Sequence, residues 1–188
     1  MHAFDFVVTL LSFVYALAIT HILATVGDII RAGKRVRFSW LNAAWMLSWL
    51  MAIVSWWIAM WGLREQKTWT MPAIGLLFVA ACSLYLSARL VCAHIPAEGQ
   101  VDLRVFHRQE GWKYATSSAA LIVLSILMTY SYGATAEGWL AENIVNWPFL
   151  AASVAAAVFP NRWVQTVAVS VILATWVWFF ATLQSALT

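Results

Sequence analysis

Residues 4–30 read FDFVVTLLSFVYALAITHILATVGDII, and this apolar run is longer than the roughly 20 helical residues that cross a bilayer. Only Asp5, His21 and Asp28 within it carry a charge or titrate near neutral pH. A run of this length and polarity predicts a transmembrane helix. Similar apolar stretches recur along the chain. The whole chain is therefore expected to consist of transmembrane helices like this first one.

The overall composition agrees with that prediction. Of the 188 residues, 63% are hydrophobic and 10% are charged, and the mean hydropathy is +0.79. Soluble domains carry about 25% charged residues, and a soluble fold of this size could not bury so much apolar surface. The composition excludes a cytosolic enzyme, a nucleic-acid-binding module and a disordered tail. It predicts an all-α, polytopic transmembrane helix bundle that is embedded in the lipid bilayer.

About six apolar segments fill the chain as one transmembrane domain over residues 1–188. The expected spans are about 4–30, 40–62, 71–93, 114–133, 145–159 and 163–187. The fifth segment is short, because a helix over residues 145–159 covers only about 22 Å. Its length favours a short span over the alternative, a re-entrant hairpin packed inside the protein. Its alanine content favours burial against neighbouring helices.

Lysine and arginine are distributed unevenly between alternate loops. The first, third and fifth loops, together with the helix end at Arg89, hold nine of the 11. The second loop holds the other two, Arg64 and Lys67, and the fourth loop holds none. Loops rich in these residues stay on the cytoplasmic side. We therefore expect both termini on the outer, periplasmic face.

Polar side chains inside a membrane are costly, which makes them the first candidates for function. His21, Thr25 and Asp28 lie at i, i+4 and i+7, on one face of the first helix. Counting residues from the middle of each span places Arg89 of the third segment at a membrane depth similar to that of His21 and Asp28. Asp28 is then the carboxylate nearest to Arg89. One interpretation is a proton- or ion-handling site in which His21 titrates, Asp28 tunes it and Arg89 is a counter-ion. The other is an Asp28–Arg89 clamp between two helices.

The first interpretation predicts a small channel or transporter-like protein. A second pattern supports a different class. Trp45, Trp49 and Trp56 fall on one face of the second helix. This stripe lines a groove for a lipid, quinone or pigment, packs between helices, or faces the lipid. The groove interpretation predicts a non-catalytic accessory or scaffold subunit of a larger membrane complex.

Nothing in the sequence points to an enzyme. The motifs GxSxG, HExxH, the P-loop and CxxC are absent, and we expect no metal site or cofactor. A haem would need two facing axial histidines. The candidates near the membrane are His21 and His94, whose estimated depths differ by about 10 Å, so no haem is expected.

Residues 10–31, LLSFVYALAITHILATVGDIIR, are followed by a basic loop and a Trp-rich second span. This arrangement resembles a group of uncharacterised bacterial inner-membrane proteins whose first helix follows the pattern LAI-(T/A)-H-(I/L)-L. The resemblance implies a bacterial origin and a multi-pass location in the inner membrane, and it implies no activity. His21 is the histidine of that pattern.

The chain has hardly any mass outside the predicted spans, so we expect it to act through other membrane chains. A homo-oligomer is the simplest case, since closed symmetric assemblies are common. Ala16, Thr20 and Ala24 form a stripe of small residues on the first helix that suits close helix contact.

Overall fold

The computed structural model describes residues 3–65, 69–131, 138–140 and 143–187, and it confirms the all-α class. Five of its helices are long and apolar enough to cross a membrane, and α6 is shorter. The helices are α1 (Ala3–Ala32), α2 (Trp40–Ala59), α3 (Met71–Val91), α4 (Leu103–Ser131), α6 (Asn146–Val158) and α7 (Arg162–Leu187). Two 3-10 turns follow α1 and α2, at Gly33–Arg35 and Met60–Glu65. Of the residues used above, Lys67 and residues 132–133 lie outside the described ranges.

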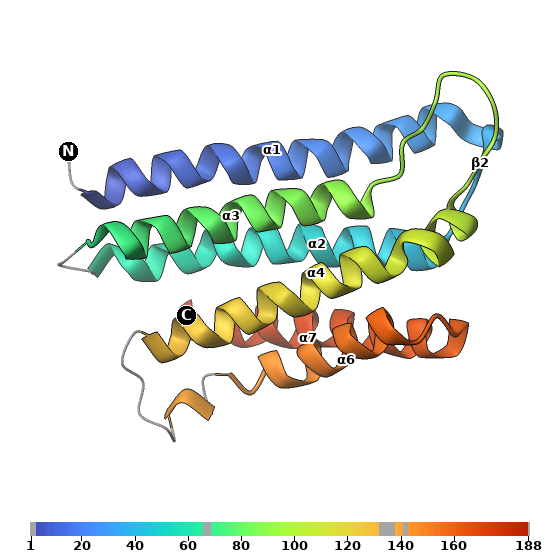
Figure 1. Cartoon of the computed structure of the whole chain (residues 1–188). Helices are drawn as coiled ribbons and strands as arrows, with labels where there is room; N and C mark the ends of the chain where they lie inside the picture. Colours follow the sequence, from blue (N-terminus) through green and yellow to red (C-terminus); the bar gives the residue numbers. More distant parts are fainter. Residues whose placement is uncertain (1–2, 66–68, 132–137, 141–142, 188) are drawn as a thin grey trace.

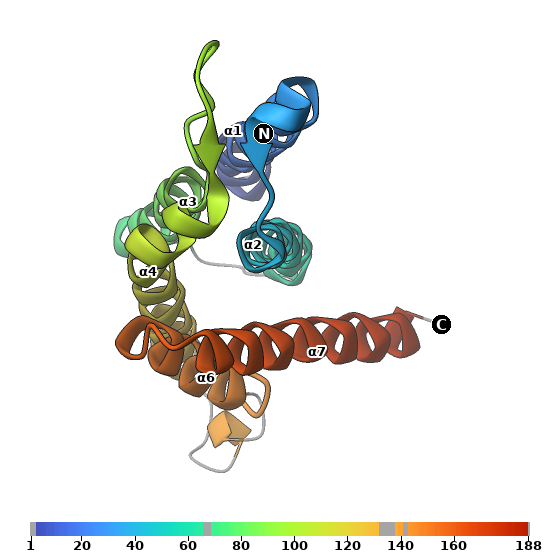
Figure 2. The same cartoon turned by 90° about the vertical axis from the view of Figure 1, so that its right-hand side faces the viewer.

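Successive helices run in opposite directions, and α1 to α4 form the main body of the molecule (Figure 1). The hairpin of α6 and α7 lies beside this body, with α6 against α4 and α7 against α2. Figure 2 looks roughly along α1, α2 and α3 but shows α7 lengthwise, so α7 is steeply tilted against the others. Both chain ends lie in the same half of the molecule (Figure 1).

The core is built from large side chains that every long helix contributes. Its centre is the Trp45 indole, which is fully buried and meets the Tyr114 ring edge-on, with the ring centroids 5.4 Å apart. The outward surface is also apolar: Phe13 and Ile30 of α1 are 67% and 74% exposed. A surface of this kind suits lipid rather than water.

The helix that contains the expected fourth span starts earlier than that span, because α4 begins at Leu103 and the span is expected from near residue 114. The charges of residues 104–113 conceal the start of this helix. Its inward face is nevertheless regular: Leu103, His107 and Tyr114 are all buried. Asp102 caps the helix, since its Oδ1 accepts hydrogen bonds from the backbone N–H groups of Arg104 and Val105, at 2.8 and 3.2 Å. The other boundaries agree with the expected spans to within about three residues.

The first and third loops are joined at the basic end of the molecule, which the sequence did not predict. The two-residue strands β1 (Val36–Arg37) and β2 (Val101–Asp102) pair in parallel. Arg35 donates to the carbonyl oxygens of Pro96 and Ala97, at 3.2 and 2.7 Å. Arg37 lies 3.3 Å from the Asp102 carboxylate. These contacts fix the ends of α1 and α4 relative to each other.

This junction predicts a pH dependence of stability. Desolvation alone would raise the pKa of Asp102, but the backbone N–H groups of Arg104 and Val105 and the Arg37 guanidinium hold that pKa below its ordinary value. A depressed folded-state pKa means that the carboxylate stabilises the fold above the unfolded-state pKa and stops doing so as the pH falls through the folded-state value. Lowering the pH from about 6 to about 3 should therefore reduce the Tm of the wild type more than that of Asp102→Asn. Equal slopes of Tm against pH for the two proteins would contradict this.

The length of α6 makes its topology worth testing. Its 13 residues cover about 20 Å, and it runs opposite to α4 (Figure 1). Leu140 precedes it and Arg162 follows it, and both are exposed. In a background without Cys82 and Cys92, we expect Leu140→Cys and Arg162→Cys to react with an impermeant maleimide from opposite sides of the membrane. Labelling of both from one side would make α6 re-entrant.

Candidate functional site

The predicted polar cluster forms only in part. The helices α1 and α3 lie side by side and run in the same direction (Figure 1). Arg89 Nη1 of α3 lies 3.2 Å from both ring nitrogens of His21 in α1. Arg89 is exposed and His21 is half-buried, so this contact lies on the outer surface of the helix pair.

The other two members of the cluster have separate partners. Thr25 is buried and donates to the carbonyl oxygen of His21 at 3.0 Å. Asp28 is exposed and lies 3.4 Å from Arg31 of its own helix. Asp28 and Arg89 therefore do not form the clamp that the sequence suggested. The reason is register: α3 places Arg89 level with His21, two helical turns before Asp28.

The tryptophan stripe divides between the core and a cleft. Trp45 is 0% exposed and packs on Tyr114, which is a packing role. Trp49 and Trp56 line a cleft of about 680 Å³ between the main body and the α6–α7 hairpin. We call this the aromatic cleft. Two of the three residues of the predicted groove therefore line this cleft.

The aromatic cleft combines large rings with small uncharged polar groups. Its rings come from α2, α6 and α7, and they belong to Trp49, Trp56, Phe149, Trp176 and Phe179. Its polar side chains belong to Ser48, Ser55, Ser118, Ser125, Thr129 and Asn146. No Asp, Glu, Lys, Arg or His is among the described residues that line it. A site of this composition suits a neutral, largely apolar ligand.

Several N–H and O–H groups around the aromatic cleft donate no hydrogen bond within the described part of the chain. Trp176 Nε1 donates to Ser48 Oγ at 3.1 Å, which leaves the Ser48 proton free to donate. The Trp49 indole nitrogen is buried without an acceptor among the described residues. Within the same part of the chain, the Ser125 hydroxyl has no hydrogen-bond partner. Donors of this kind in a largely apolar cleft favour a ligand that brings acceptors, such as carbonyl oxygens.

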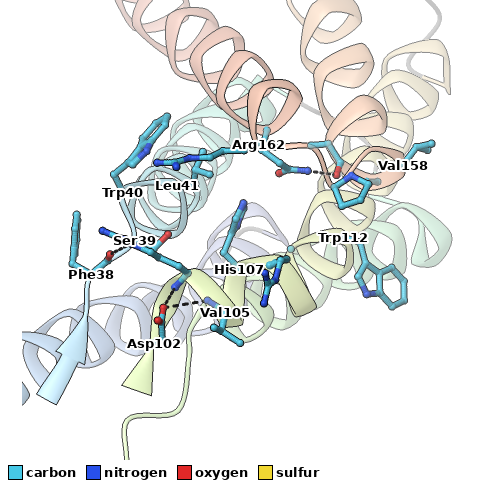
Figure 3. Close-up of a pocket in the computed structure, with 17 residues that line it drawn as sticks. Phe38, Ser39, Trp40, Leu41, Asp102, Val105, His107, Trp112, Val158 and Arg162 are labelled. Carbon is cyan, nitrogen blue, oxygen red and sulfur yellow. Dashed lines mark hydrogen bonds between the residues drawn. The ribbon is translucent and has the colours of Figure 1, made fainter. Parts of the chain in front are cut away.

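A second cavity of about 650 Å³ lies at the basic end of the molecule, where α2, α4 and α7 begin (Figure 3). Neither it nor the aromatic cleft is lined by His21, Thr25, Asp28 or Arg89. The remaining histidine of the haem hypothesis, His94, is exposed in the loop after α3. In the described part of the chain, no three His, Cys, Asp or Glu side chains gather as a metal site.

Sequence reasoning missed most of the residues that line the aromatic cleft. A signal was present, since Ser48 and Ser55 of α2 and Ser118 and Ser125 of α4 are each seven residues apart. Seven residues are close to two helical turns, so each pair marks one face, and both faces line the cleft.

The fold and the cavities together define an all-helical protein with apolar helices able to cross a membrane and an uncharged internal cleft. Comparison with known protein families, curated proteins and solved structures finds no match.

Proposed function

We propose that this protein is a non-catalytic membrane subunit that holds a neutral, membrane-soluble ligand in the aromatic cleft, with a quinone as the best-fitting class. The observation that carries the proposal is the cleft lining, which is aromatic and uncharged but rich in hydroxyl groups. A quinone ring can stack on Trp49, Trp56 or Trp176. Its carbonyl oxygens can accept hydrogen bonds from Ser48 or Ser125.

The size of the cleft supports the same class of ligand. Small-molecule sites in proteins occupy about 300–1,000 Å³, and the aromatic cleft falls within that range. A lipid with a charged headgroup would bring its charge into a site that has no described ionised partner, which is costly. A neutral headgroup avoids that cost.

The test uses tryptophan fluorescence of the purified chain in detergent. Titration with a short-chain benzoquinone should quench the emission along a saturable curve, because the tryptophans of the cleft lie against the bound ring. Excess of a non-quenching neutral lipid should not reverse the quenching. Quenching that rises linearly with the quinone concentration in the micelle would mean that the quinone only partitions into the detergent. That result would contradict the proposal.

A channel or transporter-like role is the second candidate, and one observation favours it. Arg89 is exposed on the outside of the α1–α3 pair, beside His21, without a carboxylate among its described contacts. A charged group facing lipid at this depth is costly, so a second copy of the chain that covers this surface would stabilise it. Ala16, Thr20 and Ala24 are exposed on the same helix and allow close approach.

The second candidate is tested by proton and cation flux in liposomes that contain the purified protein. Conduction between copies predicts a flux in the wild type, and it predicts that His21→Ala abolishes the flux or shifts its pH dependence. If neither the wild type nor the variant shows a flux, the channel role is contradicted, and the His21–Arg89 contact only links α1 to α3. The quinone titration is independent of this result.

A further inference from the structure

The cavity at the basic end, which we call the basic cavity, has a strongly positive setting. Three helices begin around it: α2 at Trp40, α4 at Leu103 and α7 at Arg162. The first turn of a helix carries a partial positive charge from its unpaired N–H groups. The shared direction of these helices places three helix N-termini at one cavity (Figures 1 and 3). Some of their N–H groups are already capped, by Ser39, Asp102 and Asn161.

Three arginines add full charges to this setting. Arg104, Arg108 and Arg162 all line the basic cavity and are exposed. Arg104 donates through Nε to the carbonyl oxygen of Phe38 at 3.2 Å, which leaves its terminal nitrogens available. Among the described residues, Arg108 and Arg162 have no ion-pair partner. Asp102 lines the cavity too, but its carboxylate lies 3.3 Å from Arg37.

A buried amide at the cavity wall points independently to a ligand. Gln165 is 6% exposed, and its Nε2 donates to the carbonyl oxygens of Ala156 and Phe159, at 2.6 and 3.0 Å. Its Oε1 is buried and has no donor in the described part of the chain. Since Nε2 is held by carbonyl groups at the end of α6, Oε1 is the atom of this amide that lacks a partner beside the cavity. An acceptor without a donor is costly, so the site favours a ligand that brings a hydroxyl group.

His107 supplies a further donor. It projects from α4 into the basic cavity (Figure 3), and its Nδ1 is hydrogen-bonded to the Tyr114 hydroxyl. When the Tyr114 hydroxyl donates to Nδ1, the neutral ring carries its proton on Nε2. That nitrogen can then donate to an anionic oxygen in the cavity.

Most of the remaining cavity wall is apolar, and it includes two tryptophans. Leu41 and Val158 line it, and Trp40 and Trp112 at its rim are 42% and 54% exposed. Tryptophan at a rim of this kind is typical of the headgroup region of a bilayer. Basic pockets between transmembrane helices on the cytoplasmic side bind anionic lipid headgroups.

We propose that the basic cavity binds the headgroup of an anionic glycerophospholipid. The phosphate lies between Arg108 and Arg162, and a headgroup hydroxyl donates to Gln165 Oε1. Phosphatidylglycerol fits this description, because it combines one negative phosphate with free hydroxyl groups. The site is separate from the aromatic cleft and does not depend on the quinone proposal.

The experiment measures the Tm of the full chain in detergent during titration with dioctanoyl phosphatidylglycerol. Dioctanoyl phosphatidylcholine is the zwitterionic comparison, and inorganic phosphate tests a free anion. We expect phosphatidylglycerol alone to give a saturable rise in Tm. In Arg108→Gln/Arg162→Gln, the apparent affinity should fall by about tenfold or more, since two charge-assisted contacts are lost.

The control is Arg31→Gln/Lys34→Gln, which removes the same number of positive charges from the same end of the molecule but not from the cavity. Arg31 is paired with Asp28, but that pair is exposed, and exposed pairs contribute little to stability. It should keep the wild-type affinity. An equal loss in the control would mean diffuse attraction to a basic surface and would overturn the proposal. Equal stabilisation by phosphatidylcholine would also overturn it. A saturable response to inorganic phosphate that needs the same arginines would replace the lipid with a free anion.

Discussion

Replacing Ser125 with phenylalanine is expected to weaken quinone binding by about tenfold or more, because the new ring occupies the volume that the ligand needs. Ser125 lines the aromatic cleft, and its hydroxyl has no hydrogen-bond partner among the described residues. Its loss therefore removes no side-chain hydrogen bond that the structure shows in the empty protein. The measurement is the quinone titration followed by tryptophan fluorescence.

Val123→Phe is the matched control for this variant. Val123 lies two residues away on α4, is 43% exposed and does not line the cleft. The same side chain is thus added to the same helix on another face. Val123→Phe should bind the quinone as the wild type does. If both variants bind with wild-type affinity, the ligand does not lie in the aromatic cleft.

Replacing Trp45 with alanine should cause the largest loss of stability, about 3–5 kcal/mol. The Trp45 side chain is completely buried and meets the Tyr114 ring at 5.4 Å between centroids. Its removal leaves a cavity where α2 faces α4, and the surrounding helices can close it only partly. The free energy of unfolding can be measured by titrating detergent-solubilised protein with SDS.

Trp57→Ala is the comparison for this prediction. Trp57 lies on the same helix but is 55% exposed, so its truncation should change the free energy of unfolding by less than about 1 kcal/mol. An equal loss in both variants would mean that the stability of α2 depends on its tryptophan content rather than on the Trp45 contact. The order of the two losses tests which face of α2 packs inward.

The positions of the helices could be predicted from the sequence because each span is a continuous apolar run. The start of α4 could not, since Arg104, Arg108 and Lys113 dominate its composition while the buried Leu103 and Tyr114 are spaced apart. In such a segment, helical periodicity is a better guide than mean hydropathy. The pairing of residues 36–37 with 101–102 joins distant parts of the chain, and no local pattern encodes it.

The candidate sites illustrate a similar limit. Residue counting correctly brought His21 near Arg89, because both depths follow from the helix rise. Residue counting did not exclude a contact between Asp28 and Arg89, because the register of two parallel helices depends on side-chain packing along their whole length. Likewise, the spacing of Trp45 and Trp49 identified an inward face. The spacing could not show that Trp45 lies in the core whereas Trp49 lines a cleft. The opposite wall of that cleft belongs to α6 and α7, which are distant in the sequence.

The central claim is that the aromatic cleft holds a neutral ligand, and native mass spectrometry tests it most directly. We predict that the wild type and Val123→Phe, released gently from detergent, carry the same apolar adduct, and that Ser125→Phe lacks it. The adduct mass should correspond to a quinone or another uncharged amphiphile. A wild type without any adduct, or a Ser125→Phe variant that retains the adduct, would contradict the account.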